Sequence, residues 1–370
     1  MDGEPVTLFL CGDVMLGRGV DQILPHPGDP TLREPYIRDA RDYVRLAEAG
    51  SGSVPRPAGF AWPWGAALEI LEECAPDVRL VNLETAVTRA GAFEPGKGIH
   101  YRMHPSNLGC LQAIRPDVCA LANNHVLDFG REGLTETLGA LARAGIATAG
   151  AGRNAGQARR PAAVPLAGGG RVLVFSFALP TSGVPHGWAA TEHRAGVDFV
   201  PDTTEESALA VTARIRHEKR PGDLVVVSVH WGSNWGYEVP PDHRRFAHAL
   251  VDGGADLVHG HSSHHPRPLE LYREKPVLYG CGDFINDYEG ITGYEQYRDD
   301  LRLMYLISVN RGTGRALQVR MVPLRSERLR LLRASPPDSA WLRDTLDRAC
   351  RGFGSRVVPG PDGTLVLGGG

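Results

Sequence analysis

The sequence lacks a long hydrophobic run, an excess of charge of one sign and any closely spaced pair of cysteines. None of its apolar stretches reaches the roughly 20 residues that a membrane-spanning helix needs. Its 370 residues include 40 basic and 43 acidic side chains, giving a net charge of −3, and no long run of one sign. This balance argues against a nucleic-acid face and against a polybasic membrane patch. We therefore expect no nucleic-acid partner and no membrane partner.

The cysteines bear on the compartment. Six are present, scattered along the chain without a CxxC pair. A zinc knuckle is therefore not supported, and reduced thiols fit a cytosolic location. The N-terminus has no basic region before its apolar run, which Asp13 interrupts after about the length of a strand. We read the chain as a cytoplasmic protein.

Short β-rich runs alternate with helical patterns, as is typical of an α/β domain. Helices are expected at 65–74, 131–143, 204–218 and 242–252. Strands are expected at 6–11, 78–83, 117–122, 172–179, 223–229, 256–260 and 276–280. The runs 301–309 and 317–323 predict an antiparallel pair joined by a glycine-containing turn.

The domain organisation is simple. We expect residues 1–335 to form one domain, interrupted at about 25–63 by a proline-rich insertion that lies over one face. Residues 336–370 are expected to form a C-terminal helix, 338–350, followed by a tail. The tail ends in LVLGGG, which we expect to fray.

Side chains that can bind a metal follow most of the expected strands. In open α/β sheets, ligands gather beyond the carboxyl ends of the strands. Taken alone, Asp13 could be a turn former or a helix cap, and a single buried histidine is more often structural. Several such residues at neighbouring strand ends favour a metal site. They are Asp13, Glu84, Asn124 with His125, His230, and His261 with His264.

The ligand types indicate the kind of ion. Carboxylate, amide oxygen and imidazole suit a divalent ion, with Mn, Zn, Fe and Ca or Mg left open, and the lack of thiolates argues against a structural zinc site. So many ligand-bearing strand ends can hold two ions about 3.5–4 Å apart with a bridging carboxylate. Glu84 is the candidate bridge.

Six ordered motifs resemble the CapA proteins of capsule and poly-gamma-glutamate biosynthesis, a branch of the calcineurin-like metallophosphoesterases. They span roughly residues 6–290 and read LFLCGDVMLGRG, VNLETAVT, LANNHVLDFGREGL, VVSVHWGSNWGYEVPP, LVDGGADLVHGHSSHHPR and VLYGCGDFIND. The resemblance implies an α/β fold in which a two-sheet β-sandwich is flanked by helices, in four layers. It also implies a two-metal centre on the loops at one end.

The same resemblance assigns roles to residues. Asp13 takes the place of the first metal aspartate, Glu84 that of the bridging aspartate, and Asn124 that of the metal-binding asparagine. His125 would be the catalytic acid or base, and Asp128 would orient its imidazole. The remaining metal positions fall on His230, His261 and His264.

Three departures from the family pattern bear on the reaction. The usual Asp-x-His reads Asp13-Val14-Met15, the bridging position holds Glu84, and the closing pair is spaced His-x-x-His. These departures argue against ordinary phosphoester hydrolysis. In its altered motif the chain is similar to the lasso peptide epimerases, CapA-like enzymes without an anchor that act on ribosomal peptide natural products.

The resemblance therefore favours a metal-dependent peptide epimerase that exchanges the Cα proton of a C-terminal residue in a precursor peptide. A two-metal phosphoesterase is the alternative, and a metal-stabilised binding protein for anionic peptide or poly-glutamate is the third reading. Arg102 or Arg267 would hold a substrate carboxylate. The second base stays open among His265, His100 and Glu238.

Overall fold

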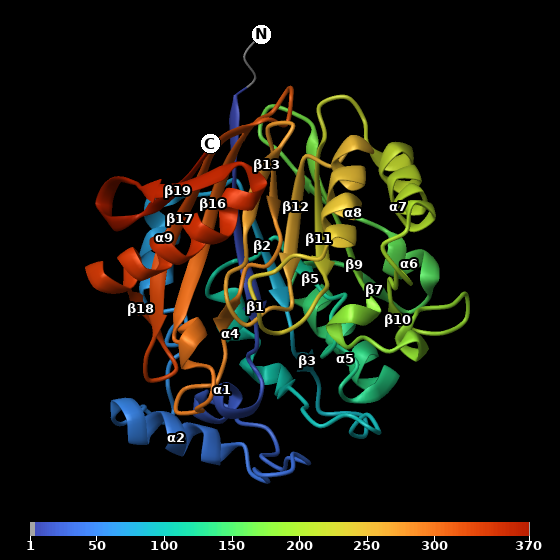
Figure 1. The fold of residues 1–370 in the computed structure, drawn as a ribbon. Helices are drawn as coiled ribbons and strands as arrows, with labels where there is room; N and C mark the ends of the chain where they lie inside the picture. Colours follow the sequence, from blue (N-terminus) through green and yellow to red (C-terminus); the bar gives the residue numbers. More distant parts are fainter. Residues whose placement is uncertain (1–3, 370) are drawn as a thin grey trace.

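Two β-sheets packed face to face, with helices on their outer faces, form the centre of the computed structural model, which describes residues 4–369 (Figure 1). The strands of the larger sheet are β1 (Pro5–Val14), β2 (Val78–Leu83), β5 (Val118–Ala120), β6 (Ala147–Ala149), β15 (Asp283–Ile285), β16 (Leu301–Asn310), β17 (Ala316–Ser326), β18 (Leu331–Arg333), β19 (Ser355–Pro359) and β20 (Leu365–Gly369). Their order is β19-β20-β17-β16-β1-β2-β5-β6, with β15 beside β1 and β18 beside β17.

The smaller sheet shares a hydrophobic cluster with the larger one. Its strands are β8 (Ala162–Pro165), β9 (Arg171–Ala178), β11 (Leu224–His230), β12 (Leu257–His261), β13 (Leu269–Tyr272) and β14 (Lys275–Leu278). They run in the order β13-β14-β12-β11-β9-β8. Two short ribbons pair β3 (Ala86–Val87) with β4 (Arg102–Met103) and β7 (Ala151–Gly152) with β10 (Gly196–Val197).

The helices cover the outer faces of the sheets and the loop end (Figure 1). They are α1 (Arg18–Ile23), α2 (Arg41–Ser51), α3 (Ala66–Cys74), α4 (Gly109–Gln112), α5 (Gly130–Arg143), α6 (Ala155–Arg159), α7 (Glu205–Glu218), α8 (Pro241–Asp252) and α9 (Pro336–Cys350).

The period of two along each strand explains the layers. In β1, Leu8 and Leu10 join the hydrophobic cluster between the sheets, whereas Phe9 joins the cluster beneath α3 and α5. In β11, Val226 faces the other sheet and Val225 packs with residues of α7 and α8. Three clusters therefore separate four layers, which confirms the expected helix-flanked two-sheet sandwich.

Parallel pairing brings together the strand ends that carry the candidate metal ligands. β1, β2, β5 and β6 are parallel neighbours, and so are β9, β11, β12 and β14. The expected antiparallel pair is also confirmed, because β16 and β17 are paired over their length. Five of the six free cysteines are buried, and these five belong to the hydrophobic clusters.

One expectation needs correction. The terminal segment LVLGGG is not frayed over its described part, because Leu365–Gly369 form β20, which pairs with β17 and β19.

The insertion at about 25–63 contains the helix α2. The apolar side of α2, including Val44 and Ala47, packs in a small cluster with Ile23 of α1.

A buried arginine fixes this insertion to the domain. Arg18 is 3% exposed, and its guanidinium donates to Glu34 Oε1 at 2.8 Å and to Asp287 Oδ2 at 3.0 Å. The Tyr43 hydroxyl lies 2.9 Å from Arg18 Nη1. Because Glu34 and Tyr43 belong to the insertion and Asp287 follows β15, one side chain joins three segments next to the strand ends.

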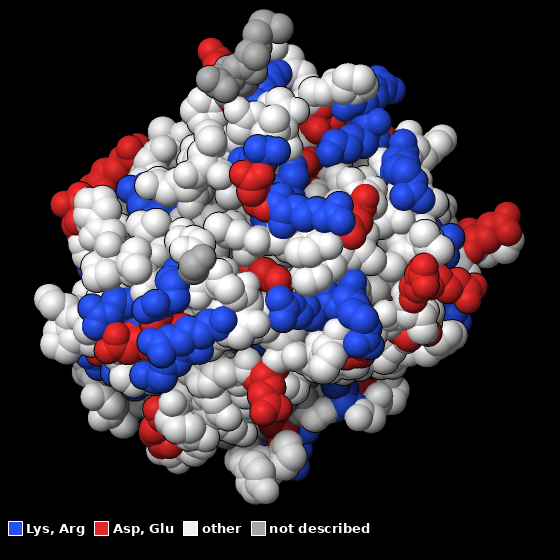
Figure 2. Space-filling model, turned by 45° about the horizontal axis from the view of Figure 1, so that its top comes forward, with Lys and Arg blue, Asp and Glu red and all other residues white. Residues whose placement is uncertain are grey.

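The surface carries mixed charge. On the face shown in Figure 2, basic and acidic side chains are interspersed, without a patch of one sign. Within residues 4–369, no helix is both long and apolar enough to span a membrane.

Candidate metal centre

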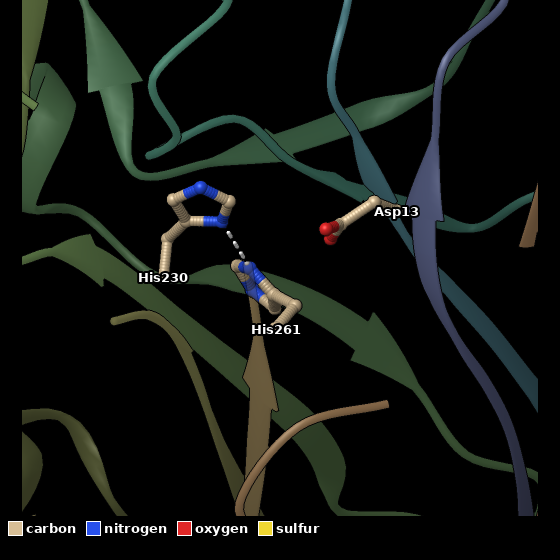
Figure 3. Close-up of side chains that lie close together, drawn as sticks. All are labelled: Asp13, His230 and His261. Atoms are coloured by element: carbon tan, nitrogen blue, oxygen red, sulfur yellow. Dashed lines mark hydrogen bonds between the residues drawn. The ribbon is translucent and has the colours of Figure 1, made fainter. Parts of the chain in front are cut away.

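Three side chains from both sheets meet beyond the strand ends (Figure 3). Asp13 is the next-to-last residue of β1, and His230 and His261 are the last residues of β11 and β12. One ligand atom from each lies within 4.8 Å of the others, and all three residues are fully buried. We call Asp13, His230 and His261 the first cluster.

A second group shares one residue with the first. Asp13, His264 and Asp283 also offer ligand atoms within 4.8 Å of one another, and we call them the second cluster. His264 Nδ1 lies 2.9 Å from Asp283 Oδ1. Asp283 begins β15 and is paired in register with Asp13 of β1. Asp13 is thus the carboxylate common to both clusters, and the bridging role expected of Glu84 stays a prediction.

Glu84 lies at the edge of the first cluster. Its Oε1 is 4.0 Å from His230 Nε2 and 3.7 Å from His125 Nε2. Asn82 Nδ2 donates to both Glu84 Oε2, at 3.2 Å, and Asp13 Oδ1, at 2.8 Å. One amide therefore holds the two carboxylates side by side.

The charges of the ion-free centre are poorly compensated. Burial, followed by the charge of Asp283, raises the pKa of Asp13 to about 7. Burial and the charge of Asp13 raise the pKa of Glu84 well above its usual range. Burial lowers the pKa of both His230 and His261. Their Nδ1 atoms nevertheless lie 2.7 Å apart.

A divalent cation fits this arrangement. Such an ion favours the ionised form of the carboxylates and the neutral form of the imidazoles, which is the form that binds metal. The donor set is carboxylate and imidazole, without thiolate, and therefore suits a divalent ion such as Mn, Fe or Zn. Burial alone would lower the pKa of His264, but the charge of Asp283 raises it, so this pair also holds its proton firmly in the absence of an ion.

The two asparagines of the Asn-Asn-His motif do different things. Asn123 is structural, because its Oδ1 accepts from the backbone amides of His125 and Val126. Asn124 faces the centre, and its Oδ1 lies 3.0 Å from His230 Nε2. The predicted amide ligand therefore stands beside the first cluster.

His125 is oriented from behind by a carboxylate. Its Nδ1 lies 2.6 Å from Asp128 Oδ2, and Asp128 also accepts from the backbone amide of Tyr101 at 2.6 Å. A proton on Nδ1 directs the Nε2 lone pair toward Glu84. Burial lowers the pKa of His125 to about 4, although Asp128 raises it, so the ring is neutral near pH 7.

Lys97 was not identified from the sequence. Its ammonium contacts Asp128 and the backbone carbonyl of Asn124, and lies 2.9 Å from His125 Nδ1. It comes from a loop and carries no motif, so only the folded chain reveals it. Its charge stabilises the Asp128 carboxylate and disfavours protonation of His125.

Asp283 was also missed, although the sequence contains a signal for it. Cys11-Gly12-Asp13 and Cys281-Gly282-Asp283 repeat the same tripeptide. The two aspartates are register partners on parallel strands. A repeated short motif at two strand ends was therefore the clue to a second carboxylate.

The two arginines expected to hold substrate are engaged elsewhere. Arg102 stacks on Phe129, with 4.4 Å between the guanidinium carbon and the ring centre. Arg267 is 2% exposed and donates to the carbonyl and hydroxyl oxygens of Ser233 at 2.8 and 2.7 Å. It thus supports the loop after β11.

The three open candidates for a second base differ in position. His265 stacks on Tyr297 and its Nδ1 donates to the Pro266 carbonyl. His100 Nε2 donates to the Glu94 carbonyl at 3.0 Å. Glu238 is exposed on the loop after β11. None of these three residues belongs to either cluster.

The fold and the site define the class: a helix-flanked, two-sheet α/β sandwich with carboxylates and histidines gathered at its strand ends as a candidate metal centre. The family model described as "Bacterial capsule synthesis protein PGA_cap" matches residues 7–288, and the chain belongs to this family. The match includes every residue of the two clusters.

Known relatives agree with this family. A protein of Mycobacterium tuberculosis named as a probable polyglutamine synthesis accessory protein is 55% identical over 370 residues, covering 99% of this chain and 97% of the relative. The PGA biosynthesis protein CapA of Bacillus subtilis is 28% identical over 316 residues, covering 84% and 70%. A solved structure, TT1561 of Thermus thermophilus, covers 85% of this chain and 97% of its own at 9% identity, with a TM-score of 0.38, too distant to support an inference.

Proposed function

We propose that this protein is a metal-dependent acid–base enzyme that epimerises a residue of a peptide chain at Cα. The sequence favoured a ribosomal precursor peptide as substrate. The names of the relatives favour a different peptide, a glutamine or glutamate polymer, and we propose that substrate class here.

One observation carries the proposal: a neutral, oriented imidazole stands next to a carboxylate and histidine centre. His125 Nε2 lies 3.7 Å from Glu84 Oε1, and Asp128 holds Nδ1 on the opposite edge of the ring. Divalent ions bound to the two clusters would polarise a substrate carbonyl and thereby acidify the adjacent Cα–H. His125 would take that proton at Nε2, and a proton returned to the other face would complete the epimerisation.

The neutral state of His125 also separates two reaction types. A base must be unprotonated before the reaction, whereas protonation of a leaving group needs an imidazolium. Burial lowers the pKa of His125 to about 4 in the ion-free protein, so near pH 7 its Nε2 is in the unprotonated form that a base requires.

The test is exchange of the Cα proton. Oligoglutamine and oligoglutamate peptides are incubated in heavy water with the protein and added Mn²⁺, and deuterium at Cα is measured by mass spectrometry. We expect incorporation with the wild type, loss of it in His125→Gln, and normal incorporation in His193→Gln, because His193 is exposed and belongs to neither cluster. Equal exchange in wild type and His125→Gln would refute the proposal.

A second candidate, phosphoester hydrolysis, is supported by the shared Asp13. Two clusters with a common carboxylate are suited to two ions that clamp an in-line displacement. The same preparations are therefore assayed with a phosphodiester. Hydrolysis without Cα exchange would replace the epimerase proposal by this one. A binding protein for anionic peptide would show neither reaction and would keep its affinity in His125→Gln.

The expected cytoplasmic location also remains part of the proposal. It is supported by the six free cysteines, five of which are buried in the hydrophobic clusters. Because five of them are buried, these thiols are labelled in intact cells and in lysate while the protein is denatured, which tests whether they are reduced in place.

A further inference from the structure

A chain of hydrogen bonds runs from the backbone of one sheet to a histidine of the first cluster. His259 Nε2 lies 2.8 Å from the Cys11 carbonyl oxygen. Ser228 Oγ lies 3.2 Å from His259 Nδ1 and 2.8 Å from His261 Nε2. All of these side chains are buried, and neither His259 nor Ser228 belongs to either cluster. We call the series Cys11 carbonyl, His259, Ser228 and His261 the relay.

The strand register explains the arrangement. Ser228 pairs with His259, and His230 pairs with His261, on the adjacent parallel strands β11 and β12. Residues two apart share a face of a strand, so all four side chains point toward the other sheet. Cys11 lies where the pairing of β1 with β2 shifts register, between Leu10 and Asp13. Its carbonyl is thereby available to His259.

The donors and acceptors in the relay have one consistent assignment. A carbonyl only accepts, so His259 Nε2 carries a proton. The His259 ring is wholly buried and its partner is uncharged, so the ring is neutral and Nδ1 is an acceptor. The Ser228 hydroxyl therefore donates to His259 Nδ1 and accepts from His261 Nε2–H. This leaves a lone pair on His261 Nδ1, which faces His230 Nδ1 and Asp13.

We propose that His259 and Ser228 are positioning residues that keep the proton of His261 on Nε2, so that His261 Nδ1 is free to bind a divalent cation in the first cluster. The inference deepens the proposed function and rests on its metal centre. Partners behind a ligating histidine fix its tautomer and orientation, and their loss lowers metal affinity. Here the fixing group is a serine and a second histidine in series, anchored on β1, which also carries Asp13.

The relay predicts losses of metal affinity of different size when Ser228 and His259 are replaced. Ser228→Ala removes the acceptor of the His261 proton and should weaken Mn²⁺ or Zn²⁺ binding by about 10- to 100-fold. His259→Phe leaves the Ser228 hydroxyl with His261 Nε2 as its acceptor. The hydroxyl then favours a proton on Nδ1, where the cation would bind. We therefore expect a larger loss of affinity in His259→Phe than in Ser228→Ala.

Two further variants control for packing. Ser228→Thr keeps the hydroxyl and should restore binding. Ser176→Ala changes a buried serine that is paired in register with Ser228 on β9, and whose hydroxyl has no hydrogen-bond partner in the described part of the chain. We expect Ser176→Ala to bind the ion as the wild type does. Cooperative thermal unfolding shows that each variant is folded.

The experiment has two measurements on protein from which a chelator has removed bound ions. The first is calorimetric titration with Mn²⁺ or Zn²⁺, and the second is nitrogen NMR of protein labelled with ¹⁵N-histidine. The NMR spectrum reads the tautomer of His261 directly, assigned by comparison with His261→Gln. We expect the Nε2–H form in the wild type and a mixture in Ser228→Ala. Unchanged affinity in both Ser228→Ala and His259→Phe, or an Nδ1–H form in the wild type, would overturn the relay. Absence of ion binding by the wild type would instead refute the metal centre, while the NMR still tests the relay.

Discussion

Replacing Asp13 by Asn should stabilise the ion-free protein at pH 8 and abolish its stabilisation by divalent ions. Burial and Asp283 raise the pKa of Asp13 from 3.8 to about 7. A carboxyl with a raised pKa binds its proton more tightly in the folded state, so folding is weakened as the pH rises from 3.8 to about 7. At about 1.4 kcal/mol per pH unit, the weakening at pH 8 amounts to about 4 kcal/mol.

The net gain is smaller because Asp13 also accepts hydrogen bonds. Asn82 Nδ2 and the Ser262 backbone amide donate to its two oxygens at 2.8 and 3.2 Å. An Asn side chain keeps one acceptor and turns an NH₂ group toward the other donor, which costs about 1–3 kcal/mol. We expect the free energy of unfolding at pH 8 to rise by about 1–3 kcal/mol. For a chain of 370 residues, this raises the melting temperature by about 1–4 °C.

The assay is scanning calorimetry at pH 4, 6 and 8 of protein from which a chelator has removed bound ions. The measurement at pH 8 is repeated with added Mn²⁺. At pH 4 the Asn variant should be no more stable than wild type, because Asp13 is then protonated in the folded state. Asp362→Asn, at an exposed turn, serves as the control. It should change neither the melting temperature of the ion-free protein nor the shift caused by Mn²⁺. A difference between Asp13→Asn and wild type that is independent of pH would refute the electrostatic reasoning, and retention of the Mn²⁺ effect would refute the role of Asp13 as a ligand.

Three further predictions follow from contacts around the centre. Lys97→Met removes an ammonium that lowers the pKa of His125, so the acidic limb of the plot of Cα exchange rate against pH should move to higher pH. A limb at the same pH would show that Lys97 does not act on the pKa of the base. Arg18→Met leaves Glu34 and Asp287 buried without their partner and should lower the free energy of unfolding, measured in urea, by about 3–5 kcal/mol. A loss below about 1 kcal/mol would contradict this expectation. Gly12→Ala places a Cβ 1.5 Å from the Gly282 carbonyl oxygen and should prevent stable folding, whereas Gly98→Ala meets no atom within 4 Å and should leave the melting temperature unchanged.

The regular elements were readable from sequence because each has a strong local pattern. The run 223–229 is apolar and β-branched, and it forms β11; the apolar spacing in 242–252 predicts the helix found as α8. The candidate ligands were readable for a related reason, since His230 and His261 end apolar strands and Asp13 is the next-to-last residue of another. A polar residue there has no role in the core, and parallel strands end at the same edge of a sheet.

Other features depend on contacts between distant segments and have no local signal. The final residues form β20 only because β17 and β19 pair with them, and Gly-rich sequence by itself predicts fraying. Lys97 reaches His125 from a loop whose path is set by tertiary contacts. Asp13 lies in both clusters because β15 pairs beside β1, and no local pattern shows this contact. The expectation that Glu84 bridges two ions stays a prediction.

The repeated Cys-Gly-Asp tripeptide shows why chemistry and packing are joined in this centre. Gly12 and Gly282 lie so close that a Cβ on Gly12 would overlap the Gly282 carbonyl, and only this approach sets Asp13 beside Asp283. Gly260 has the same function on the other sheet, since a Cβ there would lie 2.5 Å from the Leu278 carbonyl oxygen, immediately before His261. Each of these glycines directly precedes a candidate ligand. Each motif is therefore a pair in which the glycine permits the close backbone contact and the next residue supplies the candidate ligand. A side chain at the glycine would move the backbone and with it the candidate ligand.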